Sequence, residues 1–140
     1  MSAAEHWQAI AELTAPGQDY ELVEQTVRGG QVRRVFKNAP ASLIDVLTNT
    51  KRWSDFVYLR YKAEDFTFGE VNERTAKLAW FLRESCGVGP GDRVAICMRN
   101  YPEWPIGFFA PISIGAIGVA LNGWWSGDEF EYGLTDCGAK

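Results

Sequence analysis

The sequence has few of the side chains that most often carry catalysis or bind metals. Its only histidine, His6, stands near the N-terminus, where chains are often mobile. We therefore expect neither a Ser-His-Asp triad nor a histidine zinc site. The three cysteines, Cys86, Cys97 and Cys137, are widely spaced and form no Cys-x-x-Cys pair. This pattern favours a reduced protein, with Cys97 as a small buried hydrophobe in a strand.

Positive charge is missing from a long part of the chain. No Lys or Arg occurs from Asn100 to Ala139, so this stretch is a poor phosphate clamp. The net charge is −4 and no basic stripe exists, which excludes the electrostatic footprint of a nucleic-acid-binding protein. The first residues also lack the basic start and apolar core of a secretory signal, so we expect a cytoplasmic protein.

The run Trp104–Gly127 contains no charged side chain and is long enough to raise the question of a membrane span, which needs about 20 mainly apolar residues. Pro105, Pro111, five glycines and acidic flanks argue against a span. We expect instead a buried helix followed by a buried strand, and keep attachment to a membrane through residues 104–127 as an alternative.

The stretch 88–122 organises the rest of the chain. Val94–Met98 is a short apolar run bounded by turn signals, which is typical of a strand covered on both faces of a parallel sheet. Asn100 and Glu103 have the spacing of a capping box, and predict a helix over Asn100–Ile114 that is bent because two prolines each remove a donor. Gly118–Leu121 then returns as a second strand. Strand, helix and strand without a hairpin turn predict a parallel, right-handed βαβ unit.

Before this unit, the pattern predicts a helix over Ala3–Leu13 and a hairpin over residues 21–36 that turns at Gly29-Gly30. The hairpin register that places four apolar residues on one face pairs Val27 with Val32 and Val23 with Phe36. Further elements are expected as a short helix over Ser42–Thr48, a strand within Asp55–Lys62, a helix from Thr67 to about Ser85, and a helix between Ser126 and Gly138. Capped helices that alternate with apolar strands predict an α/β fold.

Three local features invite a functional interpretation. Gly87–Gly91 is rich in glycine, but it follows a helix and precedes a strand, which is the wrong order for a phosphate loop. Trp124-Trp125 lies just beyond a strand, where it could form an aromatic wall for a flat ligand, although packing of a loop on the sheet is the favoured interpretation. Asp128 and Glu129 stand in the first turn of a helix, where the helix dipole explains them without acid–base chemistry.

Five segments, in order, resemble the adenylate-forming (AMP-binding) superfamily, which includes acyl-CoA synthetases and the adenylation domains of peptide synthetases. These segments are Phe66–Val71, Gly87–Ile96, Asn100–Trp104, Gly115–Asn122 and Glu131–Lys140. The resemblance covers roughly residues 38–140, while residues 1–37 look like the start of bacterial fatty-acid–CoA ligases. It implies an incomplete α/β fold, the opening βαβαβα part of the large N-terminal domain. Residues 1–37 would be a helix and hairpin extension, and 38–140 the truncated first part of the adenylation domain.

The resemblance implies a fragment of an ATP-dependent acid–CoA ligase that acts on fatty acids and is not active alone. ATP, Mg²⁺ and CoA are implied for the full-length enzyme and none for this fragment. The family's catalytic segments would lie beyond Lys140, so no catalytic, cofactor-binding or metal residue is carried over. Ala120 and Pro111 depart from the usual family residues.

The partners implied are the remainder of the adenylation domain, a carboxylic-acid substrate and a second copy of the chain. A non-catalytic truncated relative that serves as a binding or dimerisation module is the other alternative.

Overall fold

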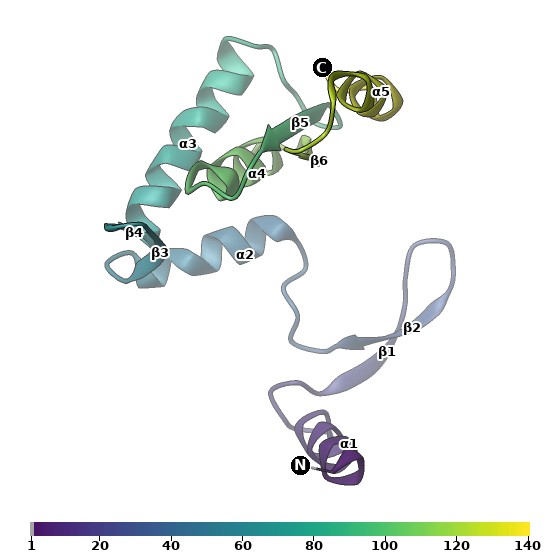
Figure 1. Ribbon diagram of the computed structural model, residues 1–140. Coiled ribbons are helices and arrows are strands. Elements are labelled where there is room, and N and C mark those ends of the chain that lie inside the picture. Colours follow the sequence, from purple (N-terminus) through teal and green to yellow (C-terminus); the bar gives the residue numbers. More distant parts are fainter. Residues whose placement is uncertain (1) are drawn as a thin grey trace. The chain divides into compact units, whose positions relative to one another are not determined.

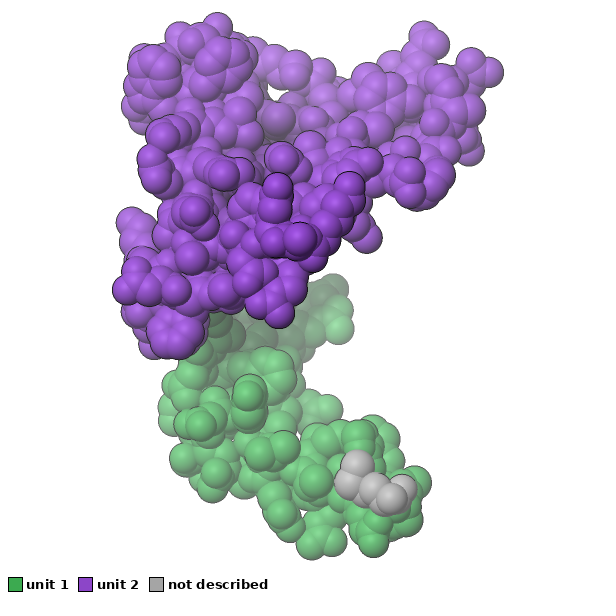
Figure 2. Space-filling view, turned by 60° about the vertical axis from the view of Figure 1, so that its left-hand side comes forward, with its two compact units in different colours: residues 1–41 green, residues 42–140 purple. Residues whose placement is uncertain are grey.

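The computed structural model describes residues 2–140, which form two compact units, residues 1–41 and 42–140 (Figure 2). The first unit consists of helix α1 (Ala3–Leu13) and an antiparallel hairpin of strands β1 (Leu22–Thr26) and β2 (Val32–Phe36). Ser2 caps α1, because its hydroxyl accepts the Glu5 N–H while the Glu5 carboxylate accepts the Ser2 N–H. The assignment of residues 1–37 as a separate extension stays a prediction.

The predicted register of the hairpin is wrong by one residue. The structure pairs Thr26 with Val32 and Leu22 with Phe36. The turn holds three residues between Val27 and Gln31, not the predicted two, because the Val27 N–H donates to the Gln31 carbonyl at 2.9 Å. Gly29 and Gly30 both take positive φ in this longer turn. The extra turn residue moves the partner of every strand residue by one position.

The second unit carries the remaining elements in an α/β order (Figure 1). They are helix α2 (Leu43–Asn49), the 3₁₀ helix η1 (Thr50–Trp53), strands β3 (Val57–Tyr61) and β4 (Glu64–Thr67), helix α3 (Phe68–Glu84), strand β5 (Arg93–Met98), helix α4 (Glu103–Ser113), strand β6 (Ile117–Asn122) and helix α5 (Gly127–Cys137). Strands β3 and β4 form an antiparallel pair, whereas β5 and β6 are parallel.

The predicted βαβ unit of β5, α4 and β6 is confirmed. The two strands pair in register from Arg93 with Ile117 to Met98 with Asn122, and α4 contacts both strands. Gly107 of α4 lies against the side chain of Ile96, where an added Cβ would make an ordinary contact at 3.6 Å. The run 104–127 thus divides between a helix and a strand, and no helix within residues 2–140 has the length and apolar content that crossing a membrane requires.

Helix α4 begins later than the sequence predicts, so the Asn100 cap is wrong. The first helical residue is Glu103, and Pro102 takes the capping position without a side-chain hydrogen bond. Tyr101 precedes a proline and is therefore disfavoured in helical conformation, which prevents a start at Asn100. Pro105 is consequently the third helical residue, where an N–H has no intrahelical acceptor in any case. A bend at Pro111, deeper in the helix, stays a prediction.

The prediction that β5 is covered on both faces is also corrected. Ile96, which faces α4, is the one residue of these two strands that is buried. Cys97 points to the opposite face and is exposed rather than buried. Ile117 shares that face through the strand register and is 50% exposed. The face of the β5–β6 sheet that packs on helix α4 is therefore more completely covered than the opposite face.

The predicted caps of α3 and α5 are confirmed. Thr67 and Ser126 each form a capping box with the glutamate three residues later, Glu70 and Glu129. Gly138 ends α5 in the left-handed conformation, with φ of 60°.

Candidate functional site

A cavity of about 540 Å³ opens at the carboxyl ends of β5 and β6. Met98 and Asn122 end the two strands side by side and both line this cavity. The complete lining is Tyr61, Met98, Arg99, Asn100, Tyr101, Trp104, Leu121, Asn122, Gly123 and Trp124. Open α/β sheets bind ligands beyond the carboxyl ends of their parallel strands, so this strand-end cavity is the candidate site.

Gly123 fixes how closely the two strand ends approach. A Cβ at this position would lie 2.9 Å from the Met98 carbonyl carbon, 3.0 Å from its oxygen and 3.1 Å from the Arg99 nitrogen. All three contacts are with backbone atoms, which cannot rotate away as the end of a side chain can. The floor of the cavity thus depends on the absence of a side chain at Gly123.

One cation lines the cavity, and it lies on an aromatic ring. The Arg99 guanidinium carbon is 3.8 Å from the centroid of the Trp124 ring. The Trp124 backbone is held by its N–H, which donates to the Asn122 side-chain oxygen at 3.0 Å. Arg99 forms no ion pair with any residue in 2–140, and Trp124 is 72% exposed. The stacked pair therefore offers both a positive charge and a flat apolar surface to a ligand.

The opposite wall is aromatic. The rings of Tyr61 and Tyr101 meet edge to face with centroids 5.9 Å apart, and Trp104 stacks on Phe108 at 5.1 Å. A neighbouring cavity of about 240 Å³ shares part of this wall and includes Arg60.

Arg60 differs from Arg99 in being fully paired. Its guanidinium donates to both Asp65 carboxylate oxygens, at 2.6 and 2.7 Å. This pair raises the pKa of Arg60 and lowers the pKa of Asp65. Arg99 is consequently the charge that remains available to a ligand.

The chemistry of the lining is suited to binding and not to covalent catalysis. Its side chains are aromatic, amide, apolar and one guanidinium, without a nucleophile–base pair or a carboxylate. Across residues 2–140, no three His, Cys, Asp or Glu side chains cluster as metal ligands would. A planar or partly apolar molecule with a negative charge matches this lining.

Comparisons with known proteins place this chain in a family. The model of the AMP-binding enzyme family matches residues 46–140. The chain belongs to the AMP-binding enzymes. It is 34% identical over 100 residues to a long-chain-fatty-acid–CoA ligase of Yersinia pestis, which covers 71% of this chain and 18% of that protein. It is 38% identical over 82 residues to a feruloyl-CoA synthase of Amycolatopsis, covering 59% of this chain and 16% of that protein.

A solved structure agrees with this family. NpsA of Klebsiella oxytoca, in complex with 3-hydroxyanthranilyl-AMSN, matches with a TM-score of 0.66 and 28% identity over 72% of this chain and 21% of that one. The predicted resemblance and the incomplete α/β fold of an adenylate-forming N-terminal domain are confirmed. The AMP-binding chain spans about a fifth of the length of the curated relatives that it matches.

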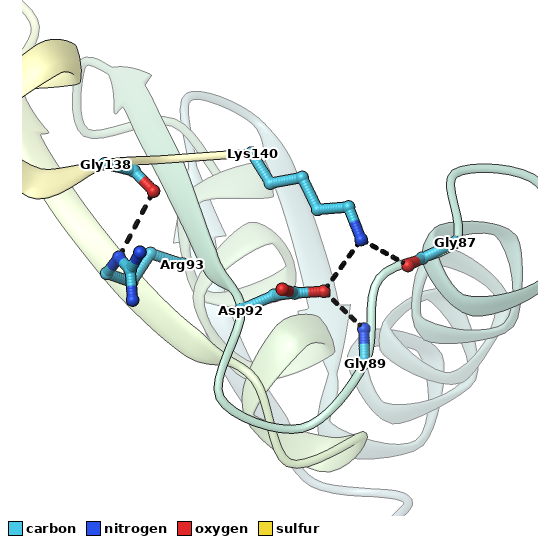
Figure 3. Close-up of polar contacts among 6 residues, drawn as sticks. All are labelled: Gly87, Gly89, Asp92, Arg93, Gly138 and Lys140. Atoms are coloured by element: carbon cyan, nitrogen blue, oxygen red, sulfur yellow. Dashed lines mark hydrogen bonds and ion pairs between the residues drawn. The ribbon is translucent and has the colours of Figure 1, made fainter.

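The glycine-rich stretch of this AMP-binding chain contacts the Lys140 ammonium (Figure 3). The Lys140 ammonium donates to the Gly87 carbonyl at 2.6 Å and to Asp92 at 3.0 Å, and the Gly89 N–H donates to the same carboxylate at 2.8 Å. The Gly89 N–H and then Lys140 lower the pKa of Asp92. The loop thus presents a carboxylate and a carbonyl to the Lys140 ammonium.

The two adjacent tryptophans have different roles in the AMP-binding chain. Trp124 lines the strand-end cavity, whereas Trp125 packs on α5, where a Cβ at Gly133 would lie 2.6 Å from its ring. Packing explains Trp125, and the functional interpretation applies to Trp124 alone. Glu129 belongs to a cap, and the Ser126 N–H lowers its pKa. His6 lies in the unit 1–41, and the cysteines are unpaired.

The sequence did not single out Arg99, Tyr61 or Tyr101 as site residues. Arg99 carried a usable signal, because it is the last cation before the long stretch without Lys or Arg and directly follows a strand. Tyr61 comes from a different sheet, and only the fold brings it to the cavity.

Proposed function

We propose that this chain is part of an ATP-dependent acid–CoA ligase of the cytoplasm. The parent enzyme would join a carboxylic acid to AMP, with ATP and Mg²⁺ as cofactors, and then transfer the acyl group to CoA. The family match over residues 46–140 carries the proposal. Curated relatives named as CoA ligases of long-chain fatty acids, benzoate and ferulate support acid–CoA ligation as the common reaction.

Fatty acids are the proposed substrates. The fatty-acid ligases match a larger share of the chain, 71% for the Yersinia protein against 56% for a benzoate ligase of Thauera aromatica. A substrate panel tests this choice. The parent enzyme should release more pyrophosphate with long-chain fatty acids than with benzoate or ferulate, and the opposite order would contradict it.

The glycine-rich loop and the metal-binding side chains of 2–140 do not fit the phosphates of ATP and the Mg²⁺ ion. The glycine-rich loop is occupied by Lys140 and Asp92, and no group of three metal-binding side chains occurs in the part of the chain that the structure describes. We propose that the parent enzyme holds the phosphates of ATP and the Mg²⁺ ion with residues outside this chain. We propose that the 140-residue chain makes no acyl-adenylate by itself.

Two measurements test that proposal. Calorimetric titration of the chain with ATP and Mg²⁺ should show no binding at micromolar concentrations. Pyrophosphate release with a panel of fatty acids should stay at background, whereas the reading frame extended beyond Lys140 should be active. A clear pyrophosphate signal from the pure chain would contradict the proposal.

A second candidate is a binding or dimerisation module that never takes part in catalysis. The strand-end cavity favours it, because Arg99 and Trp124 form a binding surface without catalytic groups. Co-expression with the remainder of the adenylation domain separates the two candidates. Restored adenylation supports the ligase fragment, and a stable but inactive complex supports the module.

A further inference from the structure

A third cavity, of about 200 Å³, lies among helices α2 and α3, the 3₁₀ helix η1 and the end of α4. None of its lining residues borders the strand-end cavity. Its apolar wall is formed by Ile44, Leu47 and Ala76, and it is open to solvent, because Ile44 and Ala76 are exposed. Its volume equals that of on the order of six water molecules, which is enough for a small organic molecule.

Most polar side chains in this helix-lined cavity are already hydrogen-bonded within the protein. The Asn72 amide donates to the Thr50 hydroxyl at 3.0 Å, and that hydroxyl donates its own proton to the Leu47 carbonyl at 2.6 Å. The Thr75 hydroxyl donates to the Val71 carbonyl at 2.7 Å. The Ser113 hydroxyl similarly donates to its own helix, to the Ala110 carbonyl at 2.7 Å. The two hydroxyls have no free proton to offer a ligand, whereas the Asn72 amide keeps one of its two N–H hydrogens.

Besides the second N–H of Asn72, two donors remain, Thr48 and Lys51. Neither side chain forms a hydrogen bond or ion pair with another residue of 2–140. They are three residues apart where α2 passes into η1, so they lie on the same side of the helical segment. Lys51 is the one charged residue of the lining, and no carboxylate opposes it.

We propose that this cavity binds a short monocarboxylate. The carboxylate would accept hydrogen bonds from the Lys51 ammonium and the Thr48 hydroxyl, and a tail of about five carbons would pack on the apolar wall. The cation selects a negative charge, and the aliphatic side chains select an apolar tail. The proposal stands independently of the ligase function, because it concerns reversible binding at a cavity separate from the strand-end site.

Titration of the whole chain with hexanoate tests the proposal, followed by amide shifts in NMR spectra. Hexanoate should shift the amides of residues 48, 51, 75 and 76, and 1-hexanol and acetate should each bind at least tenfold more weakly. Equal affinity for hexanoate and hexanol would overturn the role of the charge. Equal affinity for hexanoate and acetate would overturn the role of the apolar wall.

Three variants locate the site. Lys51→Gln should weaken hexanoate binding at least tenfold, to the level of hexanol. The matched control is Arg52→Gln, which makes the same charge change one residue later; Arg52 stacks on Trp53 at 4.0 Å and does not line the cavity. Ala76→Leu should abolish binding by filling the cavity without any change of charge.

Unchanged binding in both Lys51→Gln and Ala76→Leu would overturn the proposal. So would an equal loss in Lys51→Gln and Arg52→Gln, because it would indicate attraction to the general surface charge alone. Amide shifts that cluster at the strand-end cavity would also overturn it.

Discussion

Replacement of Gly123 by alanine tests whether the close approach of the two strand ends builds the strand-end cavity. The added Cβ would lie 2.9 to 3.1 Å from three backbone atoms of Met98 and Arg99. Contacts under 3.0 Å require a shift, and here the shift must separate β6 from β5. Overpacking of this kind costs about 1–3 kcal/mol of stability. In urea, where small proteins lose about 1–3 kcal/mol per molar, the midpoint should fall by roughly 1 M.

The matched control is Gly127→Ala at the first position of α5. A Cβ there meets nothing within 4 Å, so the control should leave the urea midpoint unchanged or raise it slightly. Both variants are compared with the wild type by urea denaturation monitored by circular dichroism. If Gly123→Ala unfolds at the wild-type midpoint, the strand ends are not in backbone contact and the argument for the cavity floor is refuted.

Three other predictions follow from the caps and the cavity. Thr67→Ala should lower stability by about 1 kcal/mol in urea denaturation, because α3 loses the hydroxyl that accepts the Glu70 N–H. Backbone N–H groups lower the pKa of Glu70 and Glu129 in the folded protein. The stability that these carboxylates contribute is therefore fully present above their unfolded pKa of about 4.3. It is lost as the pH falls through the lower pKa of the folded state. Thermal melts should therefore be level near pH 6 and fall below about pH 4, and the Glu70→Gln variant should fall less. Arg99→Met should change the fluorescence of Trp124 through loss of the cation above its ring, and a wild-type spectrum would contradict the stacked geometry.

Short-range signals explain why much of the fold could be predicted from the sequence. Thr67 and Ser126 cap their helices with glutamates only three residues away, so both partners are visible in the sequence. The order of strand, helix and strand over residues 93–122 likewise leaves little choice but a parallel crossover. These features depend on residues that are close along the chain, so they can be predicted without knowledge of the tertiary structure.

Two of the wrong predictions, the hairpin register and the start of α4, concern a choice between two local structures that the sequence pattern allows. The hairpin could turn with two or three residues. The two-residue turn was favoured because it places four apolar side chains on one face, but this pattern is not sufficient to choose the turn length. Asn100 had a cap-forming side chain, but Pro102 moved the start of α4. Tyr61 could not be assigned to the strand-end cavity, because β3 reaches it only through the packing of the whole unit.

The composition of β5 and β6 is explained only partly by the contacts that the chain makes. Continuous apolar strands are typical of parallel sheets that are covered on both faces, and isolated two-stranded sheets are marginal in water. Ile96 is buried against α4, whereas Cys97 and Ile117 on the other face remain exposed. The relatives are more than five times as long as the matched segment, which is 18% of their length. We therefore infer that the exposed face of β5 and β6 is adapted to further elements of an adenylation domain. The same apolar surface is a reason to expect self-association when those elements are missing.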